Sequence, residues 1–238
     1  MNFVEGEVLY VAKPLNWTSF GLVSKVRGKI QGTFRIKKLK VGHAGTLDPL
    51  ATGVMIICTG KATKKIETFQ YQTKEYVATL KLGATTPSFD MEHGEDAVFP
   101  TEHITRELVD ETIRRFTGEI WQIPPVYSAV KIDGIRAYDY ARKGKEVELK
   151  PKLLVIDEIE VLDFSLPTLK IRVVCSKGTY IRALARDIGE ALNSGAYLIG
   201  LERTKVGQKR LEDCWKIDDL MNHLEKEAAR TDTSISTQ

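Results

Sequence analysis

The sequence predicts an α+β domain with a mixed sheet, and three observations support this class. Residues 54–59 (VMIICT) form a fully apolar run, typical of a buried strand. Residues 76–82 alternate apolar and polar side chains, as a half-exposed strand does. Residues 179–192 repeat apolar side chains at helical spacing. Because strands and helices alternate without a regular βα period, the pattern favours α+β over a parallel α/β fold.

The N-terminal third of the chain reads as strand, helix, loop and strand. Residues 7–13 predict a short strand. Ser19 is the expected N-cap of a helix whose apolar face holds Leu22, Val23, Val26 and Ile30. Residues 42–53 carry three glycines and a proline, which indicates an irregular loop before the strand at 54–59.

The remaining elements follow the same signals. After an acidic loop reaching Pro100, residues 108–116 predict a helix that Gly118 stops, and residues 122–144 predict an extended excursion. Residues 153–164 and 169–175 predict strands, and residues 179–192 predict the amphipathic helix. A last helix is expected at residues 217–229, followed by a frayed polar end at 230–238.

Composition indicates a soluble, unexported protein. The chain has 238 residues, of which 42% are hydrophobic and 28% are charged. This length allows a core without disulfides, and no apolar run approaches the roughly 18 residues that span a bilayer. Glu5 and Glu7 stand where a signal peptide would be apolar. The three isolated cysteines favour a reducing compartment, and we expect a cytoplasmic location.

Charge is distributed unevenly along the chain, although the net charge is only +3. Residues 25–40 hold seven Lys or Arg and no acid, whereas residues 88–112 hold eight acids and one base. A basic run beside acidic segments is the electrostatic pattern of a polyanion site. A solvated loop is the alternative interpretation of such a run.

Motifs for several common chemistries are missing from the sequence. There is no G-x-G-x-x-G for a dinucleotide and no G-x-S-x-G for acyl transfer, and residues 60–62 (GKA) lack the rest of a P-loop. The four histidines have no metal-ligand spacing, and the H-x-E at residues 93–95 has no P-C-x-x-C after it. We therefore expect no cofactor and no metal.

The segment with the most chemical character is residues 42–53, GHAGTLDPLATG, in which Asp48 is the single carboxylate. Its glycines allow positive φ or a close approach to a ligand, and Pro49 stiffens the turn. A rigidly held carboxylate at the edge of a core is a candidate nucleophile or base. The alternative is a turn aspartate that bonds its own backbone.

This segment resembles the catalytic motif of the TruB-type pseudouridine synthases, G-H-x-G-x-L-D-P-x-x-x-G. Further segments resemble motifs of the same family in the same order, and together they cover about residues 7–207: residues 13–19 (KPLNWTS), 74–83 (KEYVATLKLG), 85–90, 124–142 (PPVYSAVKIDGIRAYDYAR), 175–189 (CSKGTYIRALARDIG) and 195–207 (GAYLIGLERTKVG).

The resemblance implies the pseudouridine-synthase fold, with a central, mixed and mainly antiparallel sheet flanked by helices and loops. It also implies an enzyme that isomerises uridine 55 in the TΨC loop of tRNA to pseudouridine. The reaction breaks the N1–C1′ bond, turns the uracil and rejoins it through C5. Such an isomerisation needs no redox cofactor, nucleotide or metal.

The resemblance assigns catalytic roles to three residues. Asp48 is the catalytic carboxylate, which either attacks C1′ or takes a proton from C2′. Arg182 is its cationic partner, and arginine suits this role because it stays charged. Tyr76 lies under the flipped uracil, where an aromatic platform offsets part of the cost of unstacking.

The resemblance also implies contacts with the RNA. Tyr180 and Leu201 line the uracil pocket, although both are equally compatible with plain core positions. His43 fills the gap that the flipped nucleotide leaves, and Asp90 lies near the bases. The expected phosphate contacts are lysines and arginines at Lys13, Lys61, Lys64, Lys131, Arg142 and Lys143.

Two departures from the family pattern are visible in the first and last motifs. Asn16 replaces a glycine, which the turn tolerates because Asn adopts left-handed backbone readily. Glu202 replaces a frequent arginine, and this removes a possible phosphate contact.

The resemblance suggests a catalytic domain at residues 1–210, in which residues 122–152 clasp the T arm. Residues 211–238 are expected to form a short helix and tail without a PUA domain. We expect a monomer that acts on tRNA without a membrane or an obligate protein partner. Two alternatives remain open: an RNA-folding protein of the same fold, or a family synthase redirected to another RNA.

Overall fold

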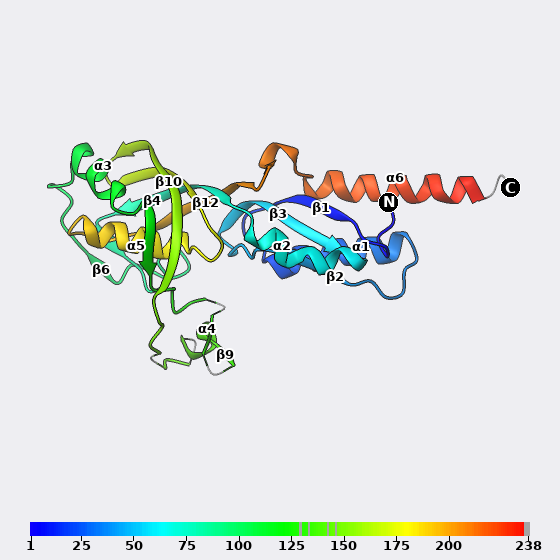
Figure 1. Cartoon of the computed structure of the whole chain (residues 1–238), viewed down its shortest axis with the longest axis horizontal. Helices are drawn as coiled ribbons and strands as arrows, with labels where there is room; N and C mark the ends of the chain where they lie inside the picture. Colours follow the sequence, from blue (N-terminus) through cyan, green and yellow to red (C-terminus); the bar gives the residue numbers. More distant parts are fainter. Residues whose placement is uncertain (129, 133, 142, 146, 236–238) are drawn as a thin grey trace. The chain divides into compact units, whose positions relative to one another are not determined.

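The computed structural model of the chain describes residues 1–128, 130–132, 134–141, 143–145 and 147–235 (Figure 1). The chain divides into two compact units. Unit 1 comprises Met1–Lys74 and Glu202–Gln238, and unit 2 comprises Glu75–Leu201. The described residues contain no helix that is long and apolar enough to cross a membrane.

Unit 1 is built on strand β3 (Ala51–Thr59), the apolar run expected to be buried. Strand β1 (Val8–Lys13) pairs with it antiparallel from Val8↔Cys58 to Lys13↔Gly53. Strand β2 (Val41–Ala44) pairs antiparallel with the last four residues of β3. The end of strand β12 (Ala196–Val206) forms a hairpin with β13 (Lys209–Arg210).

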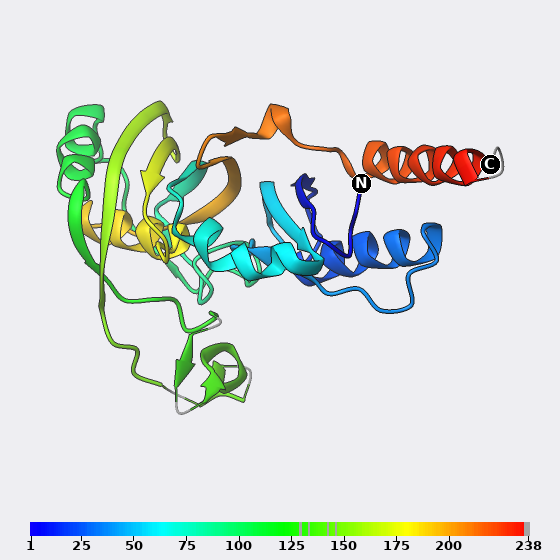
Figure 2. The same cartoon turned by 45° about the vertical axis from the view of Figure 1, so that its right-hand side comes forward.

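Two helices bury the apolar side of unit 1. Helix α1 (Ser19–Thr33) buries Leu22, Val23, Val26 and Ile30, as its sequence pattern predicts. Helix α6 (Ile217–Ile235) lies along α1 and adds Leu220 and Leu224 to the same core (Figure 2). The sequence predicts that the last helix ends at residue 229 and that a frayed end follows. This boundary is wrong, because α6 continues to Ile235. A 3-10 turn η1 (Gly60–Lys65) and helix α2 (Ile66–Tyr71) follow β3.

The cap of α1 also differs from the expectation. Thr18, and not Ser19, is the N-cap, and its hydroxyl accepts the backbone N–H of Gly21 at 2.9 Å. Ser19 is the first helical residue and is buried. Its hydroxyl is consequently available for a contact outside the helix.

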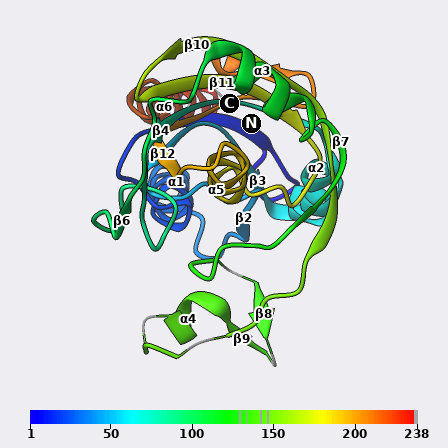
Figure 3. The same cartoon turned by 90° about the vertical axis from the view of Figure 1, so that its left-hand side faces the viewer.

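Unit 2 contains the strand order β4-β11-β10-β7, formed by β4 (Lys74–Leu82), β11 (Thr168–Cys175), β10 (Lys152–Ser165) and β7 (Gly118–Gln122). The strands curve around helix α5 (Ile181–Ala191), which buries seven of its residues (Figure 3). Helix α3 (Arg106–Arg114) ends before Gly118, which has φ +98° and begins β7. Gly118 is thus the start of a strand and not the helix stop. The short strands β5 (Ala84–Thr85) and β6 (Ala97–Val98) pair within the acidic loop.

The predicted excursion leaves unit 2 between β7 and β10 (Figure 1). It carries a small hairpin of β8 (Lys131–Ile132) and β9 (Ile135–Arg136) and the short helix α4 (Ala137–Ala141). The predicted α+β class is confirmed, and the sheet pairings described in each unit are antiparallel.

Candidate active site

Asp48 lies in the aspartate loop, residues 45–50, which joins β2 to β3 in unit 1. Ser19 holds this loop through two hydrogen bonds to one residue. Its hydroxyl donates to the Leu47 carbonyl at 2.8 Å and accepts the Leu47 N–H at 2.9 Å. The backbone on one side of Asp48 is thereby fixed to the first turn of α1.

The other side of Asp48 is fixed by the KPLNWTS segment. The Pro49 carbonyl accepts the Asn16 N–H at 2.9 Å and faces the Lys13 ammonium at 3.4 Å. Asn16 has φ +63°, which confirms that asparagine supports the left-handed turn where the family motif has glycine. The Asp48 carbonyl itself accepts the Ala51 N–H at 3.1 Å, so the loop closes as a turn.

Arg203 is the residue that sequence reasoning missed. Only 1% of it is exposed, and its guanidinium donates to the carbonyls of Val54 at 2.8 Å and Gly45 at 2.9 Å. Gly53 makes the close packing possible, because a Cβ there would lie 2.2 Å from the Arg203 carbonyl oxygen. No local signal marks Arg203, because Glu202 and Lys205 in the same segment are also charged and only partly buried.

Lys13 is not a surface cation. It is 1% exposed, and its ammonium donates to the carbonyls of Pro14 at 2.9 Å and Trp17 at 2.6 Å as well as facing Pro49. Burial lowers its pKa to about 8, against the attraction of the Asp48 carboxylate. Lys13 is therefore an internal cation beside the aspartate loop, and the phosphate contact expected of it stays a prediction.

His43 is half-buried on β2, three residues before Thr46. Its Nε2 lies 3.0 Å from the Thr46 hydroxyl. Burial lowers the His43 pKa, and the nearby Arg203 charge lowers it further. The His43 ring is therefore neutral at neutral pH. A neutral ring suits the expected role of filling the gap left by a flipped nucleotide better than it suits a contact with a phosphate.

Unit 2 holds the other predicted site residues. Tyr76 is buried on β4, on the same face as Ala78, Leu80 and Leu82, so the predicted alternation is confirmed. Leu201 is half-buried on β12. Both positions are consistent with the pocket role that the motifs imply.

Arg182 stands in the first turn of α5 and is 5% exposed. Its guanidinium donates to the carbonyls of Ser88 at 3.0 Å and Tyr127 at 2.8 Å. Arg182 is therefore not a solvated residue of the helix surface. A buried guanidinium is costly unless it is paired and hydrogen-bonded, and the Ser88 and Tyr127 carbonyls supply hydrogen bonds to Arg182.

Asp90 lies beside Arg182 in unit 2, with 3.7 Å between Oδ2 and the arginine Nε. The carboxylate also accepts the Ser88 hydroxyl at 2.6 Å and the Glu92 N–H at 3.0 Å. With 5% exposure it is an internal group. Asp90 therefore contacts Arg182 within unit 2, and its expected placement near RNA bases stays a prediction.

Tyr180 is the N-cap of α5 and is held by Gln122, a second residue that the sequence did not reveal. The Gln122 amide accepts the Tyr180 N–H at 2.8 Å and donates to the Tyr180 carbonyl at 3.2 Å. Gln122 is 1% exposed. The start of α5, and with it Arg182, is consequently fixed to the end of β7.

The predicted phosphate contacts differ in their surroundings. Lys61 is exposed and pairs with Glu5 at 2.6 Å, and Lys64 is exposed on η1. Lys143 is exposed in the excursion. Arg142 and the side chain of Lys131 lie outside the described residues.

No group of three or more His, Cys, Asp or Glu within the described part of the chain is placed to hold a metal ion. In unit 1, two buried cations, Lys13 and Arg203, lie at the loop that carries Asp48. Unit 2 holds the predicted site residues Tyr76, Tyr180, Arg182 and Leu201.

Comparison with known proteins decides the family. Residues 32–181 match the TruB family pseudouridylate synthase N-terminal domain, and residues 182–235 match the tRNA pseudouridylate synthase B C-terminal domain. The chain belongs to the TruB family of pseudouridylate synthases. It is therefore an isomerase.

Individual relatives agree with this assignment. The TruB chain is 70% identical over 227 residues to "tRNA pseudouridine synthase B" of Phocaeicola vulgatus, covering 95% of this chain and 97% of the relative. It is 52% identical to the protein of the same name from Flavobacterium johnsoniae, covering 86% and 90% of the two chains.

Solved structures show the pseudouridine-synthase fold. A chain in the "Crystal Structure of a Cbf5-Nop10-Gar1 Complex" matches with a TM-score of 0.69 and 26% identity. A chain in the "Structure of H/ACA RNP bound to a substrate RNA containing 2'-deoxyuridine" matches with a TM-score of 0.64 and 26% identity. The matches cover 95% and 92% of the TruB chain but only 60% and 53% of the solved chains.

Proposed function

We propose that this TruB chain converts uridine 55 in the TΨC loop of tRNA to pseudouridine, with Asp48 as the catalytic carboxylate. The observation that carries the proposal is the fixation of the aspartate loop. Four separate groups hold its backbone: the Ser19 hydroxyl, the Asn16 N–H, the Lys13 ammonium and the Arg203 guanidinium. A carboxylate on so constrained a backbone is preorganised for attack or proton transfer.

Two buried cations lie at the loop that carries Asp48. Lys13 is close enough for its charge to interact with Asp48, and the Arg203 guanidinium contacts the same loop. Asp48 then either attacks C1′ as the N1–C1′ bond breaks or takes the C2′ proton to give a glycal.

After that bond breaks, the freed uracil turns and C5 bonds to C1′. The C5 proton leaves and N1 ends with a proton, so substrate and product are isomers. Tyr76 supports the ring from below, and stacking of this kind contributes about 1–3 kcal/mol per base. Arg182, held by Ser88, Tyr127 and Asp90, provides the fixed positive charge that a reacting carboxylate needs.

The substrate is a tRNA recognised by the shape of its T arm, which the excursion at residues 122–152 clasps. The enzyme works as a monomer without a partner protein. Its compartment is the one that holds tRNA, the cytoplasm.

The test uses an unmodified tRNA transcript with tritium at uracil C5. Wild-type protein should release one tritium per transcript, and a matched transcript with cytidine at position 55 should release none. Release that continues from the cytidine-55 transcript would move the target elsewhere in the RNA. No release from either transcript, despite binding, would favour an RNA-folding protein.

A further inference from the structure

Two open hollows on the surface of unit 1 share Lys40 in their walls. The first is also lined by Arg27, Lys37 and Lys38, and the second by Lys64. We call these five cations the basic stripe. It contains most of the acid-free run at residues 25–40 and continues onto η1, which lies beside Lys40 because the Gly60 N–H donates to the Lys40 carbonyl at 2.8 Å.

The loop at residues 34–40, which carries Lys37, Lys38 and Lys40, is anchored to the core of unit 1. Leu39 is buried in the core of unit 1, and Phe34 and Ile36 pack against that core. The Gln31 amide donates to the Lys37 carbonyl at 3.1 Å. Apolar anchors thus alternate with exposed cations, which a merely solvated loop does not require.

One acid, Glu67, lines the second hollow together with Lys40 and Lys64, but it forms no ion pair with them. None of the five forms an ion pair with any residue in the described part of the chain. Neighbouring cations do: Lys29 pairs with Glu225, and Lys61 pairs with Glu5. Like charges held together on an ordered surface repel one another, and a bound polyanion relieves that repulsion.

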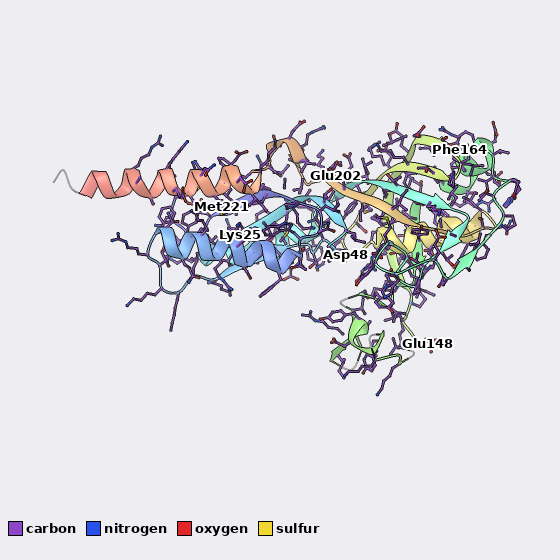
Figure 4. The ribbon with its side chains drawn as sticks, turned by 180° about the vertical axis from the view of Figure 1, so that it is seen from behind. Lys25, Asp48, Glu148, Phe164, Glu202 and Met221 are labelled. Atoms are coloured by element: carbon purple, nitrogen blue, oxygen red, sulfur yellow. The ribbon has the colours of Figure 1, made fainter. Side chains whose placement is uncertain are left out.

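The stripe is separated from the catalytic carboxylate. Strand β2 runs from the stripe to the aspartate loop, and its four residues span about 13 Å. Arg27 of the stripe lies on the 15-residue helix α1, whose first residue, Ser19, holds the aspartate loop. Figure 4 labels Lys25 on α1 and Asp48 in the loop. The stripe is consequently out of reach of a nucleotide flipped toward Asp48.

We propose that the basic stripe binds the phosphate backbone of the substrate RNA at nucleotides away from the target uridine. Lysine and arginine side chains at such a surface neutralise phosphates and orient the RNA without reading its bases. The identity of this RNA rests on the proposed function, whereas the contact with phosphate does not. The stripe is then a second anchor that adds affinity and sets the direction in which the RNA leaves the active site.

The experiment compares two variants that lose the same charge. The stripe variant is Lys37→Gln/Lys38→Gln/Lys40→Gln, and the control is Lys170→Gln/Lys216→Gln/Lys226→Gln, whose lysines are exposed elsewhere. Binding of unmodified tRNA transcript is measured at several salt concentrations. We expect the stripe variant to bind the transcript about tenfold more weakly than the wild type. A plot of log K against log salt concentration should also become less steep, and its slope should fall in magnitude by about three, one for each lost phosphate contact.

The control should change both quantities by much less. Tritium release should show a higher KM and an unchanged kcat for the stripe variant, because the aspartate loop is intact. Equal weakening in both variants, or an unchanged salt slope, would overturn the proposal. Failure of the uridine-55 assignment would instead appear as missing tritium release with normal binding by the wild type, so the two failures are distinguishable.

Discussion

Nη2 of Arg203 lies 2.9 Å from the carbonyl oxygen of Gly45, although 158 residues separate the two in sequence. The same guanidinium donates to the Val54 carbonyl at 2.8 Å. One buried side chain near the end of β12 therefore joins the first residue of the aspartate loop to the strand that follows the loop.

Replacement of Arg203 by methionine should leave both carbonyls without their donor. Loss of such a buried partner costs about 1–3 kcal/mol per group, so for the two carbonyls we expect a loss of about 2–6 kcal/mol in unfolding free energy. The loop should also shift, which lowers kcat by about tenfold or more. Denaturant unfolding and tritium release measure the two effects. Arg203→Lys should recover part of kcat, and an unchanged kcat in Arg203→Met would refute the positioning role.

Ser19 and Thr18 offer a matched pair of hydroxyl deletions. Thr18→Ala removes the helix cap and should cost about 1 kcal/mol of stability with an unchanged kcat. Ser19→Ala removes both hydrogen bonds to Leu47 and should cost a similar amount of stability but also lower kcat. Melting curves and single-turnover rates distinguish them. Equal kcat values in the two variants would show that the Ser19 contact does not position Asp48.

Gln122 should act on substrate binding through Tyr180. Gln122→Leu removes both amide contacts to the Tyr180 backbone, which should loosen the start of α5 and raise KM for tRNA severalfold. Glu119→Gln, at an exposed position of the same strand, is the control. Steady-state kinetics with tRNA transcript test this. If the two variants have the same KM, Tyr180 does not depend on its link to Gln122.

Lys13 should make stability depend on pH. Burial lowers its pKa in the folded protein to about 8, from the ordinary value of 10.5 for a lysine. Between these values the unfolded chain holds more protons than the folded protein, so unfolding free energy should rise with pH across that window. Lys13→Met lacks this group, and the wild type should gain stability relative to it between pH 8 and 10. Parallel stability curves from urea unfolding would contradict the lowered pKa.

Local patterns were sufficient for most of the elements. The apolar run of β3, the alternation of β4 and the helical faces of α1 and α5 each determine a face or a buried strand within a short window. The first and last residues of the helices were less predictable from the sequence. Thr18 and Ser19 are both good capping residues, and only the contact with Leu47, 28 residues away, determines which of them caps α1.

The site was predictable where a motif is local and less so where a contact is distant. The GHAGTLDPLATG segment identifies Asp48, but the sequence does not show that Lys13 is buried beside it. Exposed and buried lysines look alike in a sequence, because burial depends on carbonyls contributed by Pro14, Trp17 and Pro49. Arg203 and Gln122 were missed for the same reason, since each acts on backbone groups far along the chain.

Single-turnover tritium release by Asp48→Asn is the most direct test of the central claim. Asparagine keeps the size and turn geometry of aspartate but removes its charge. With a uridine-55 transcript we predict release slower than that of the wild type by about 10²–10⁴-fold or more, with tRNA binding and thermal stability close to those of the wild type. Release at the wild-type rate would show that the carboxylate of Asp48 does not take part in the reaction.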